Sequence, residues 1–452
     1  MTDIDSLRLR VGGHGVLGAG IPWYASPFGR DSILTSLMML FVAPQLAVET
    51  LRTLAAYQGE RDDDWREEEP GKIMHELRRG ELARAGEIPH SPYYGTIDAT
   101  PLWLVLLGET WRWTGDDALV DELMPSAERA LAWIERRLDQ GGGFIRYQRK
   151  HARGLENQGW KDSRDGVSFP DGEIADPPIA LVEVQGYVVA AYDAMARIRR
   201  RRGDLRGAHQ MRERARAMRR RIDEAFWVEE TGFYALALDG RGRQVPTITS
   251  NPGHLLFCRA APSTRVGHLA QVLLGGGMYS GWGVRTLARG QAVYNPLSYH
   301  NGTVWPHDNA LIAVGLAQSG RVAEALTIFE GLYQASLHFR DMRLPELFCG
   351  MARGEDDFLV HYPVSCSPQA WASATFFLLI QAALGLHPEA PLGRLTIRNP
   401  RLPRFLRVFD IEGMRVGESL VSLHFKQHDD RTHVDLTRIE GDRRLKVNIE
   451  IG

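Results

Sequence analysis

Two acids in different loops are the residues best suited to catalysis in this sequence. Asp162 lies in the segment Gly-Trp-Lys-Asp-Ser at residues 159–163, and Glu346 lies in Leu-Pro-Glu-Leu-Phe at residues 344–348. The apolar neighbours of Glu346 can raise the pKa of its carboxyl group. A carboxylic acid that protonates a leaving oxygen, with a second carboxylate that activates water or attacks, is the pair that cleaves glycosidic bonds. These loops therefore predict Asp162 and Glu346 as catalytic residues.

Aromatic and polar side chains in neighbouring loops could hold a sugar ring beside these acids. Indole packs on the C–H face of a sugar, while guanidinium, amide and carboxylate groups bind its hydroxyls. We expect Trp23, Trp160 and Trp305 to line one site. The predicted substrate-binding residues are Trp23, Arg30, Asp31, Asp98, Trp160, Lys161, His300, Asn301, Trp305 and His307.

Some of these acids have a simpler interpretation. Asp31 and Asp98 each stand at the start of a predicted helix, where a carboxylate can cap backbone N–H groups without binding a substrate. Glu346 could likewise be purely structural. Asp162 is harder to explain in that way, because a turn alone rarely needs two carboxylates, a Lys and a Trp together.

Motifs for other chemistries are incomplete. Residues 13–18 match Gly-x-Gly-x-x-Gly, but Pro22 follows where dinucleotide binding needs a helix, so we predict a flexible loop. The His-Glu pair at 75–76 lacks the second histidine of a zinc-binding helix, and His300 and His307 have no cysteine near them. A Gly-x-Ser-x-Gly nucleophile motif does not occur in the sequence. We therefore predict no cofactor and no metal.

Composition excludes several classes of partner. The 54 Lys and Arg residues balance 56 Asp and Glu residues, and the formal net charge of −2 gives no general attraction to nucleic acid. An arginine-rich stretch at 197–221 has no interleaved aromatic residues and is typical of solvated helix faces. No apolar leader is visible, the longest apolar stretch (371–386) is short for a membrane span, and three cysteines suit a reducing compartment. We expect a cytoplasmic protein with an oligo- or polysaccharide substrate, and neither nucleic acid nor a membrane as partner.

The elements that must position these loops are predicted to be paired helices. Apolar residues at three- and four-residue spacing predict helices at 33–41 and 46–55, 99–113 and 117–138, 180–202 and 204–226, 253–260 and 264–274, 305–319 and 321–340, and 367–386. Long loops separate the pairs, at 59–97, 140–178, 227–252, 276–304 and 341–366, and loops of this length are usually functional. Helical hairpins stacked in a ring would bring such loops to one end. We therefore predict a mainly α fold, an (α/α)6 toroid, over residues 1–390.

The pattern changes after Pro388. Short alternating runs at 394–397, 420–425, 434–436 and 445–449 predict strands. Residues 391–452 are therefore predicted to form a small β-rich C-terminal domain packed directly on the helices.

The sequence resembles bacterial amylo-alpha-1,6-glucosidases, which are glycogen debranching-type proteins within the broader mannosylglycerate-hydrolase-like set of (α/α)6 glycosidases. The resemblance rests on Gly-Ile-Pro-Trp-Tyr…Phe-Gly-Arg-Asp-Ser at 20–32, Gly-Trp-Lys-Asp-Ser at 159–163, His-Asn-Gly-Thr-Val-Trp-Pro-His-Asp at 300–308 and Leu-Pro-Glu-Leu-Phe at 344–348. It implies that Asp162 is the general acid and Glu346 the general base. It also implies that Arg30 and Asp31 hold the reacting sugar, with His300, Asn301 and Trp305 near it.

Such proteins usually carry a β-rich N-terminal domain and a further helix before the Gly-Ile-Pro-Trp motif, whereas this sequence begins almost at that motif. About eleven of the twelve toroid helices are predicted, and Thr2 to Gly20 holds too few apolar residues for another. We expect a gap with exposed apolar faces at 33–41 and 371–386. A missing N-terminal domain, a homo-oligomeric contact or the C-terminal strands would cover it.

The predicted function is an inverting glycoside hydrolase that cleaves α-glucosidic bonds, with the α-1,6-branches of a glycogen-like glucan as first candidate. For an inverting mechanism the two carboxyl groups should stand roughly 6.5–9.5 Å apart. One alternative is a hydrolase of a small α-glycoside, such as a trehalose-like or glycosylglycerate-like compound. A second alternative is an inactive glycan-binding or scaffold protein.

Overall fold

The computed structural model describes residues 2–354, 358–429, 431–441 and 444–451, and a ring of inner helices lies at its centre. Successive members of the ring pack on one another, and the last returns to the first. They are α2 (Gly29–Met38), α5 (Ala99–Thr114), α7 (Val182–Arg201), α9 (His254–Phe257), α11 (Pro306–Gln318) and α13 (Ala370–Leu384). Every residue of α2 is buried, as expected for a helix surrounded by other helices.

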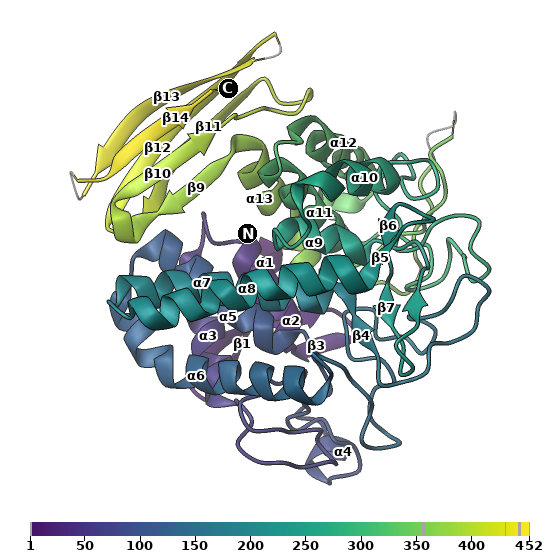
Figure 1. The fold of residues 1–452 in the computed structure, drawn as a ribbon. Helices are drawn as coiled ribbons and strands as arrows, with labels where there is room; N and C mark the ends of the chain where they lie inside the picture. Colours follow the sequence, from purple (N-terminus) through teal and green to yellow (C-terminus); the bar gives the residue numbers. More distant parts are fainter. Residues whose placement is uncertain (1, 355–357, 430, 442–443, 452) are drawn as a thin grey trace.

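A second layer of helices runs along the outside of this ring (Figure 1). Its members are α3 (Pro44–Ala56), α6 (Asp117–Gln140), α8 (Leu205–Phe226), α10 (Ser263–Leu273) and α12 (Val322–Ser336). Local signals set their starts: the carboxylates of Asp116 and Asp204 accept the backbone N–H of Leu119 and Gly207. The two layers form an (α/α)6 toroid, which confirms the predicted fold class.

The predicted gap beside the first and last helices is wrong for the described residues. The helix α1 (Thr2–Ser6) packs on α13, and the strand β2 (His14–Gly20) packs on α2, α3 and α13. Ile4 of α1, Leu7 directly after it, and Val16 and Leu17 of β2 are at most 3% exposed. A short helix and a strand therefore cover the place at which a gap was predicted.

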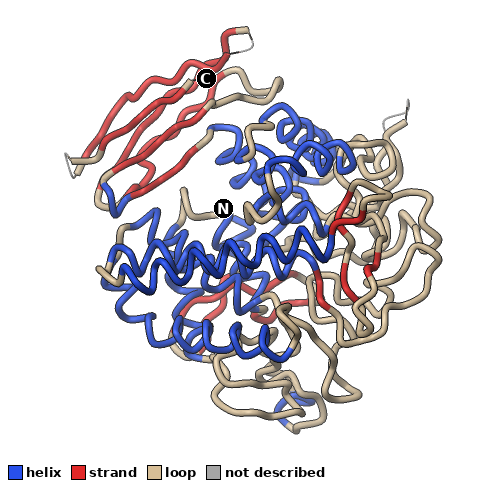
Figure 2. Tube along the Cα trace, viewed as in Figure 1, coloured by secondary structure: helices blue, strands red, loops and turns tan. Residues whose placement is uncertain are grey.

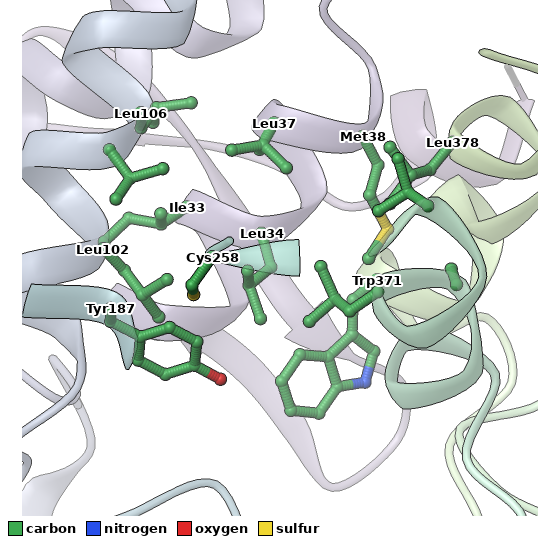
Figure 3. Close-up of a cluster of buried hydrophobic side chains, with 14 of the residues drawn as sticks. Ile33, Leu34, Leu37, Met38, Leu102, Leu106, Tyr187, Cys258, Trp371 and Leu378 are labelled. Atoms are coloured by element: carbon green, nitrogen blue, oxygen red, sulfur yellow. The ribbon is translucent and has the colours of Figure 1, made fainter. Parts of the chain in front are cut away.

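The faces of α2 and α13 that were expected to be exposed are in contact with each other. Residues 33–41 are all buried, and so are most of residues 371–386. Figure 3 shows Met38 of α2 beside Leu378 of α13, with Leu102 and Leu106 of α5 on the other side of α2. The chain itself fills this part of the core.

The glycine motif at residues 13–18 belongs to a β-hairpin, so the predicted flexible loop is wrong. The strand β1 (Arg8–Val11) pairs antiparallel with β2, and β2 pairs with β3 (Tyr24–Pro27). Gly12 and Gly13 occupy the tight turn with φ values of 57° and 86°, a conformation that favours glycine. These glycines shape a turn next to the toroid.

The C-terminal residues form two three-stranded sheets beside the toroid (Figure 1). One has the order β14-β10-β9, from Lys446–Glu450, Arg394–Arg398 and Leu386–Glu389, and its β10–β14 pair is parallel. The other has the order β11-β12-β13, from Val408–Val416, Ser419–His428 and Arg431–Glu440. The four predicted strand runs correspond to β10, β12, β13 and β14, whereas β9 and β11 were missed.

The long loops gather on the side of the toroid away from the C-terminal strands (Figure 2). They carry the short helix α4 (Glu81–Arg84), the 3-10 turn η1 (Asn251–Gly253) and the short strands β4 (Ala180–Leu181), β5 (Trp227–Val228), β6 (Phe233–Tyr234), β7 (Ala237–Leu238) and β8 (Gln244–Val245). Isolated bridges join distant loops, such as Gly20 to Gln369 and Val304 to Phe348. Within the described ranges, no helix has the length and apolarity needed to cross a bilayer.

Candidate active site

The guanidinium group of Arg30 lies between two carboxylates from different loops. Its Nη1 is 2.5 Å from Oδ2 of Asp98, and its Nη2 is 3.7 Å from Oδ2 of Asp162. The side chains of Arg30 and Asp98 are 4% and 1% exposed, whereas that of Asp162 is 32% exposed. The arginine thus links a buried acid to one that solvent can reach.

Two helix starts bring these groups together. The helix α2 begins at Gly29, where a Cβ would lie 2.1 Å from the carbonyl oxygen of Met74, so glycine allows the chain to pass close to the neighbouring loop. Arg30 and Asp31 follow in the first turn of α2, and Asp98 directly precedes α5.

Neither acid caps its helix, so capping alone does not explain these residues. The residue before α2 is Phe28, and no side chain caps that helix. Asp98 accepts a hydrogen bond from Thr96 Oγ1 at 2.6 Å, together with its contact to Arg30, and makes no capping bond to α5.

Glu346 is a buried acid whose two oxygens are both hydrogen bonded. The hydroxyl group of Tyr299 donates to Oε1 at 2.5 Å, and the backbone N–H of Cys366 donates to Oε2 at 3.0 Å. The backbone N–H of Glu346 also donates to the carbonyl oxygen of Cys366 at 2.9 Å. With 2% of its surface exposed, Glu346 is held in one orientation by groups from two loops.

Three acids of the site, Asp31, Asp162 and Glu346, hold their protons more tightly than ordinary carboxyl groups. Desolvation by the surrounding protein raises the pKa of Asp162 to about 6, against the opposing effect of Arg30. Burial raises the pKa of Asp31, Arg30 lowers it, and the charges of Glu346 and Asp162 raise it, which together bring it to about 7. Burial also raises the pKa of Glu346, to which the charge of Asp162 contributes. Because the charges of Asp162 and Glu346 affect these pKa values, the three carboxyl groups lie near one another.

The cluster can both donate and accept a proton. Asp162 is partly exposed and protonated in mildly acidic solution, so it can act as an acid towards a bound molecule. The hydrogen bonds from Tyr299 and Cys366 favour the ionised form of Glu346, against the effect of burial. An acid and a carboxylate in one site are the groups that glycosidic bond cleavage needs.

Trp160 and Trp305 form an aromatic block that supports the acids. Their ring centroids are 5.7 Å apart, and the ring of His300 stacks on Trp305 at 5.0 Å. His300 Nδ1 is 2.6 Å from the hydroxyl oxygen of Ser163, the residue after Asp162. Trp305 Nε1 donates to the carbonyl oxygen of Tyr299 at 3.0 Å. The block thus fixes the backbone beside Asp162 and beside the tyrosine that binds Glu346.

Three other residues that were expected to bind substrate lie among protein groups. The ammonium group of Lys161, which is 4% exposed, donates to the carbonyl oxygen of Thr286 at 2.6 Å. The amide of Asn301 donates to Oδ2 of Asp165 at 2.8 Å. The buried ring of His307 stacks on Trp371, with centroids 3.6 Å apart. The contacts of Lys161 and Asn301 hold the loop that carries Asp162, and the contact of His307 belongs to the core beneath that loop.

Trp23 lies apart from the other two tryptophans. It is 63% exposed, and its Nε1 donates to the carbonyl oxygen of Val364 at 2.9 Å. Trp160 and Trp305 are 3% and 2% exposed. The structure therefore brings two of the three predicted tryptophans together, and it leaves the third with an open ring on a neighbouring loop.

Sequence reasoning missed two tyrosines of the site. Tyr299 binds Glu346, and Tyr24 lies close enough to Tyr299 and Glu346 for both to affect the pKa of its hydroxyl group. Burial raises the pKa of Tyr24 to about 12. Each tyrosine stands next to a residue that was predicted, Tyr24 after Trp23 and Tyr299 before His300. Their position in the motifs was the available signal. Among the described residues, no group of three or more His, Cys, Asp or Glu side chains could hold a metal ion.

A ring of helical hairpins with acids, an arginine and tryptophans in its loops is the arrangement of (α/α)6 glycoside hydrolases. Over residues 30–344 the sequence matches the family described as the mannosylglycerate hydrolase MGH1-like glycoside hydrolase domain. The chain belongs to this family and is a glycoside hydrolase. The match includes Asp162 and ends two residues before Glu346.

Solved structures share the fold at low sequence identity. The GH63 mannosylglycerate hydrolase of Thermus thermophilus in complex with Tris has a TM-score of 0.60 and 15% identity, over 84% of this chain and 98% of that one. Its complex with glucose has a TM-score of 0.60 and 16% identity, over 80% and 95%. The GH78 family rhamnosidase of Bacillus sp. GL1 has a TM-score of 0.65 and 14% identity, over 95% of this chain. This chain spans 39% of that rhamnosidase. No curated protein sequence matches the chain.

Proposed function

We propose that the protein is an inverting hydrolase of α-glucosidic bonds, in which Asp162 is the general acid and Glu346 the general base. The observation that carries this proposal is the contrast between the two acids. Asp162 is 32% exposed and has a pKa of about 6, so it can present a proton to a bound substrate. Glu346 is buried and accepts two hydrogen bonds that favour its ionised form.

The proposed reaction moves one proton at each acid. Asp162 gives its proton to the glycosidic oxygen as the bond from that oxygen to the anomeric carbon breaks. Glu346 takes a proton from the water that attacks the anomeric carbon from the opposite face. The Arg30 guanidinium group pairs with Asp98 and holds Asp162 from one side, so it orients the acid before the proton leaves. The products are a free sugar with inverted anomeric configuration and the alcohol that was its leaving group.

The charge around the site supports a neutral substrate. Three carboxyl groups lie near Arg30, those of Asp31, Asp98 and Asp162. A fourth, that of Glu346, lies near Asp31. The arginine already pairs with Asp98 at 2.5 Å, so a carboxylate on the substrate would meet mainly like charge. The first candidate is a neutral glucan with α-1,6-branches, as the resemblance to amylo-alpha-1,6-glucosidases implies.

A small α-glycoside is the second candidate. It is supported by the fold match to a mannosylglycerate hydrolase over 98% of that chain, because an enzyme named for a small glycoside has this architecture at nearly full length. The charge argument favours a neutral compound such as trehalose over glucosylglycerate within this group.

The test is hydrolysis of a small panel by the purified protein. Isomaltose, panose, limit dextrin, trehalose and glucosylglycerate are incubated in turn, and the anomer formed first is followed by proton NMR. We expect release of glucose in the β configuration, with limit dextrin and panose cleaved fastest. Release of the α-anomer first would contradict inversion. Hydrolysis of none of the five would contradict the proposed function and favour a glycan-binding protein.

A further inference from the structure

Trp23 combines an exposed ring with a fixed orientation. Tryptophan is highly buried on average, yet 63% of this residue is exposed. Its one polar atom, Nε1, donates to the carbonyl oxygen of Val364, which lies 341 residues further along the chain. The hydrogen bond holds the indole against the neighbouring loop while the ring stays open to solvent.

The backbone around Trp23 joins the loop that holds Glu346. The N–H of Ile21 donates to the carbonyl oxygen of Pro368 at 3.0 Å, and the N–H of Ser367 donates to the carbonyl oxygen of Ile21 at 2.9 Å. Cys366, whose N–H binds Glu346, lies between this pairing and Val364 in the chain.

A second connection runs through the residue after Trp23. The side chain of Tyr24 lies near that of Tyr299, which donates to Glu346, and the charge of Glu346 raises the pKa of Tyr24. Trp23 directly precedes Tyr24, and Val364 is two residues before Cys366. Both residues are therefore close in sequence to groups around Glu346. The exposed ring lies at the edge of the candidate active site, on the side of this acid.

The exposed side chains at this edge are chemically suited to one kind of ligand. Val364 is 55% exposed and Ile21 is 38% exposed, so aliphatic surface accompanies the indole. Exposed apolar patches often mark ligand-binding surfaces. A sugar ring offers an apolar C–H face to an aromatic ring and keeps its hydroxyls in water. An apolar patch at the edge of the candidate active site therefore fits a further part of the same glycan.

We propose that Trp23, with Ile21 and Val364, forms a stacking surface for a sugar ring outside the two that share the scissile bond, so that the preferred substrate is an oligosaccharide of three or more units. This inference rests on the proposed function and names its substrate class. Asp162 and Glu346 act on the scissile bond, and Trp23 selects the length of the chain.

The test compares kcat/KM of the Trp23→Ala variant on substrates of different length. Isomaltose is the short substrate, and panose and limit dextrin are the longer ones. We expect kcat/KM on panose and limit dextrin to fall about tenfold, the size of one lost aromatic stack, and kcat/KM on isomaltose to change less than about twofold. Equal changes on short and long substrates, or no change on any, would overturn the inference.

The Trp23→Phe variant separates stacking from support of the loop. It keeps an aromatic face but loses the N–H that binds Val364. If Trp23 stacks on a sugar, this variant should keep most of the activity on longer substrates. If Trp23 only holds the loop, Trp23→Phe should resemble Trp23→Ala, and the inference is wrong. Leu205→Ala changes a side chain that is 68% exposed on α8, and it should leave both substrates unaffected.

Failure of the proposed function gives a different result. In that case the wild-type protein hydrolyses none of the glucosides, and the inference is tested by binding alone. Titration calorimetry with isomaltotriose then compares the wild type with Trp23→Ala. Binding that weakens about tenfold in the variant supports the stacking surface. Equal affinity of the two proteins, or no binding by the wild type, overturns it.

Discussion

The carboxyl groups near Arg30 share one environment but differ in their access to solvent, and this difference assigns their roles. Asp98 is 1% exposed and pairs directly with the arginine, so it serves to hold that side chain. Asp31 is 5% exposed, and burial raises its pKa to about 7. Asp162 combines a raised pKa with 32% exposure of its side chain. Among these three acids, it is the one placed to pass a proton to a substrate.

The activity should depend on pH through Asp162 and Glu346. Asp162 must be protonated as the acid, so kcat/KM should fall as the pH rises through about 6. Glu346 must be ionised as the base, and its pKa is raised above 4.5, so kcat/KM should also fall in more acidic solution. A profile of kcat/KM from about pH 4 to about pH 9 on a hydrolysed glucoside should therefore have its maximum in the mildly acidic range. Constant kcat/KM across the alkaline half of that profile would contradict the role of Asp162.

Asp31 should make the folded protein less stable as the pH rises. Its pKa is about 7 in the folded protein and 3.8 in an ordinary carboxyl group, so the folded state binds the extra proton between these values. The free energy of unfolding that this proton contributes is fully present below about pH 4 and is lost as the pH rises through about 7. About three pKa units correspond to about 4 kcal/mol. Urea titrations at about pH 4 and about pH 8 should show that Asp31→Asn gains stability over the wild type at the higher pH.

The exposed Asp5 provides a control for this measurement. The Asp5→Asn variant should follow the wild type at both pH values. If Asp31→Asn shows no gain relative to the wild type between the acidic and the alkaline titration, the buried carboxyl group does not hold its proton in the way described.

At the scale of elements, the sequence predicted the helices better than the segments between them. The apolar periodicity at 99–113 and 117–138 corresponds to α5 (Ala99–Thr114) and α6 (Asp117–Gln140), because helical packing repeats within a short window. The hairpin of β1 and β2 was missed because the segment from Gly12 to Gly20 is rich in glycine, which is typical of a loop. The apolar residues of β2 are buried by packing on α2 and α13, and α13 is distant in sequence.

Sequence reasoning predicted only part of the candidate site, again because contacts between distant residues leave no local pattern. Asp162 and Glu346 were visible because each stands in a loop of unusual composition. The hydrogen bond of Tyr299 to Glu346 joins residues 47 positions apart, and no local pattern marks it. Lys161 was assigned to substrate because it neighbours Asp162, but successive residues in an irregular loop can point in different directions.

The loop that carries Asp162 should depend on Lys161 as a positioning residue. Its ammonium group is buried and donates to the carbonyl oxygen of Thr286, and the acids Glu183 and Asp308 contribute favourable charge. Lys161→Met removes this buried hydrogen bond and the positive charge beside Glu183 and Asp308, while the backbone N–H of Ser250 still donates to the carbonyl oxygen of Thr286 at 3.2 Å. The loss should lower the free energy of unfolding by about 1–3 kcal/mol. It should also lower kcat more than it changes KM, because the acid loses its fixed position. Lys426→Met, at an exposed residue of β12, is the matched control. Unchanged stability with a raised KM would instead show that Lys161 binds substrate.

At the scale of the whole molecule, the N-terminal segment completes the toroid. The last inner helix, α13, packs on the first, α2, and both contact β2. Leu17 of β2 is 1% exposed within this contact. The ring and the hairpin therefore share one core, and they should unfold together.

The Leu17→Ala variant tests this shared core. Removing a buried leucine side chain leaves a cavity and should lower the free energy of unfolding by about 2–5 kcal/mol in a urea titration. Leu205→Ala, at a residue that is 68% exposed, should change it by less than about 0.5 kcal/mol. Equal stability of the two variants would mean that the hairpin is not part of the cooperative unit.

The division of labour between Asp162 and Glu346 is tested most directly by a substrate that needs no acid. Fluoride leaves α-D-glucosyl fluoride without being protonated, whereas the sugar oxygen of a glucoside needs a proton. For Asp162→Asn we predict a loss of about 10²–10⁴-fold in kcat on a glucoside but turnover of the fluoride within about tenfold of the wild type. For Glu346→Gln we predict a large loss on both substrates. Equal losses of Asp162→Asn on the two substrates, or wild-type turnover of the fluoride by Glu346→Gln, would contradict the account.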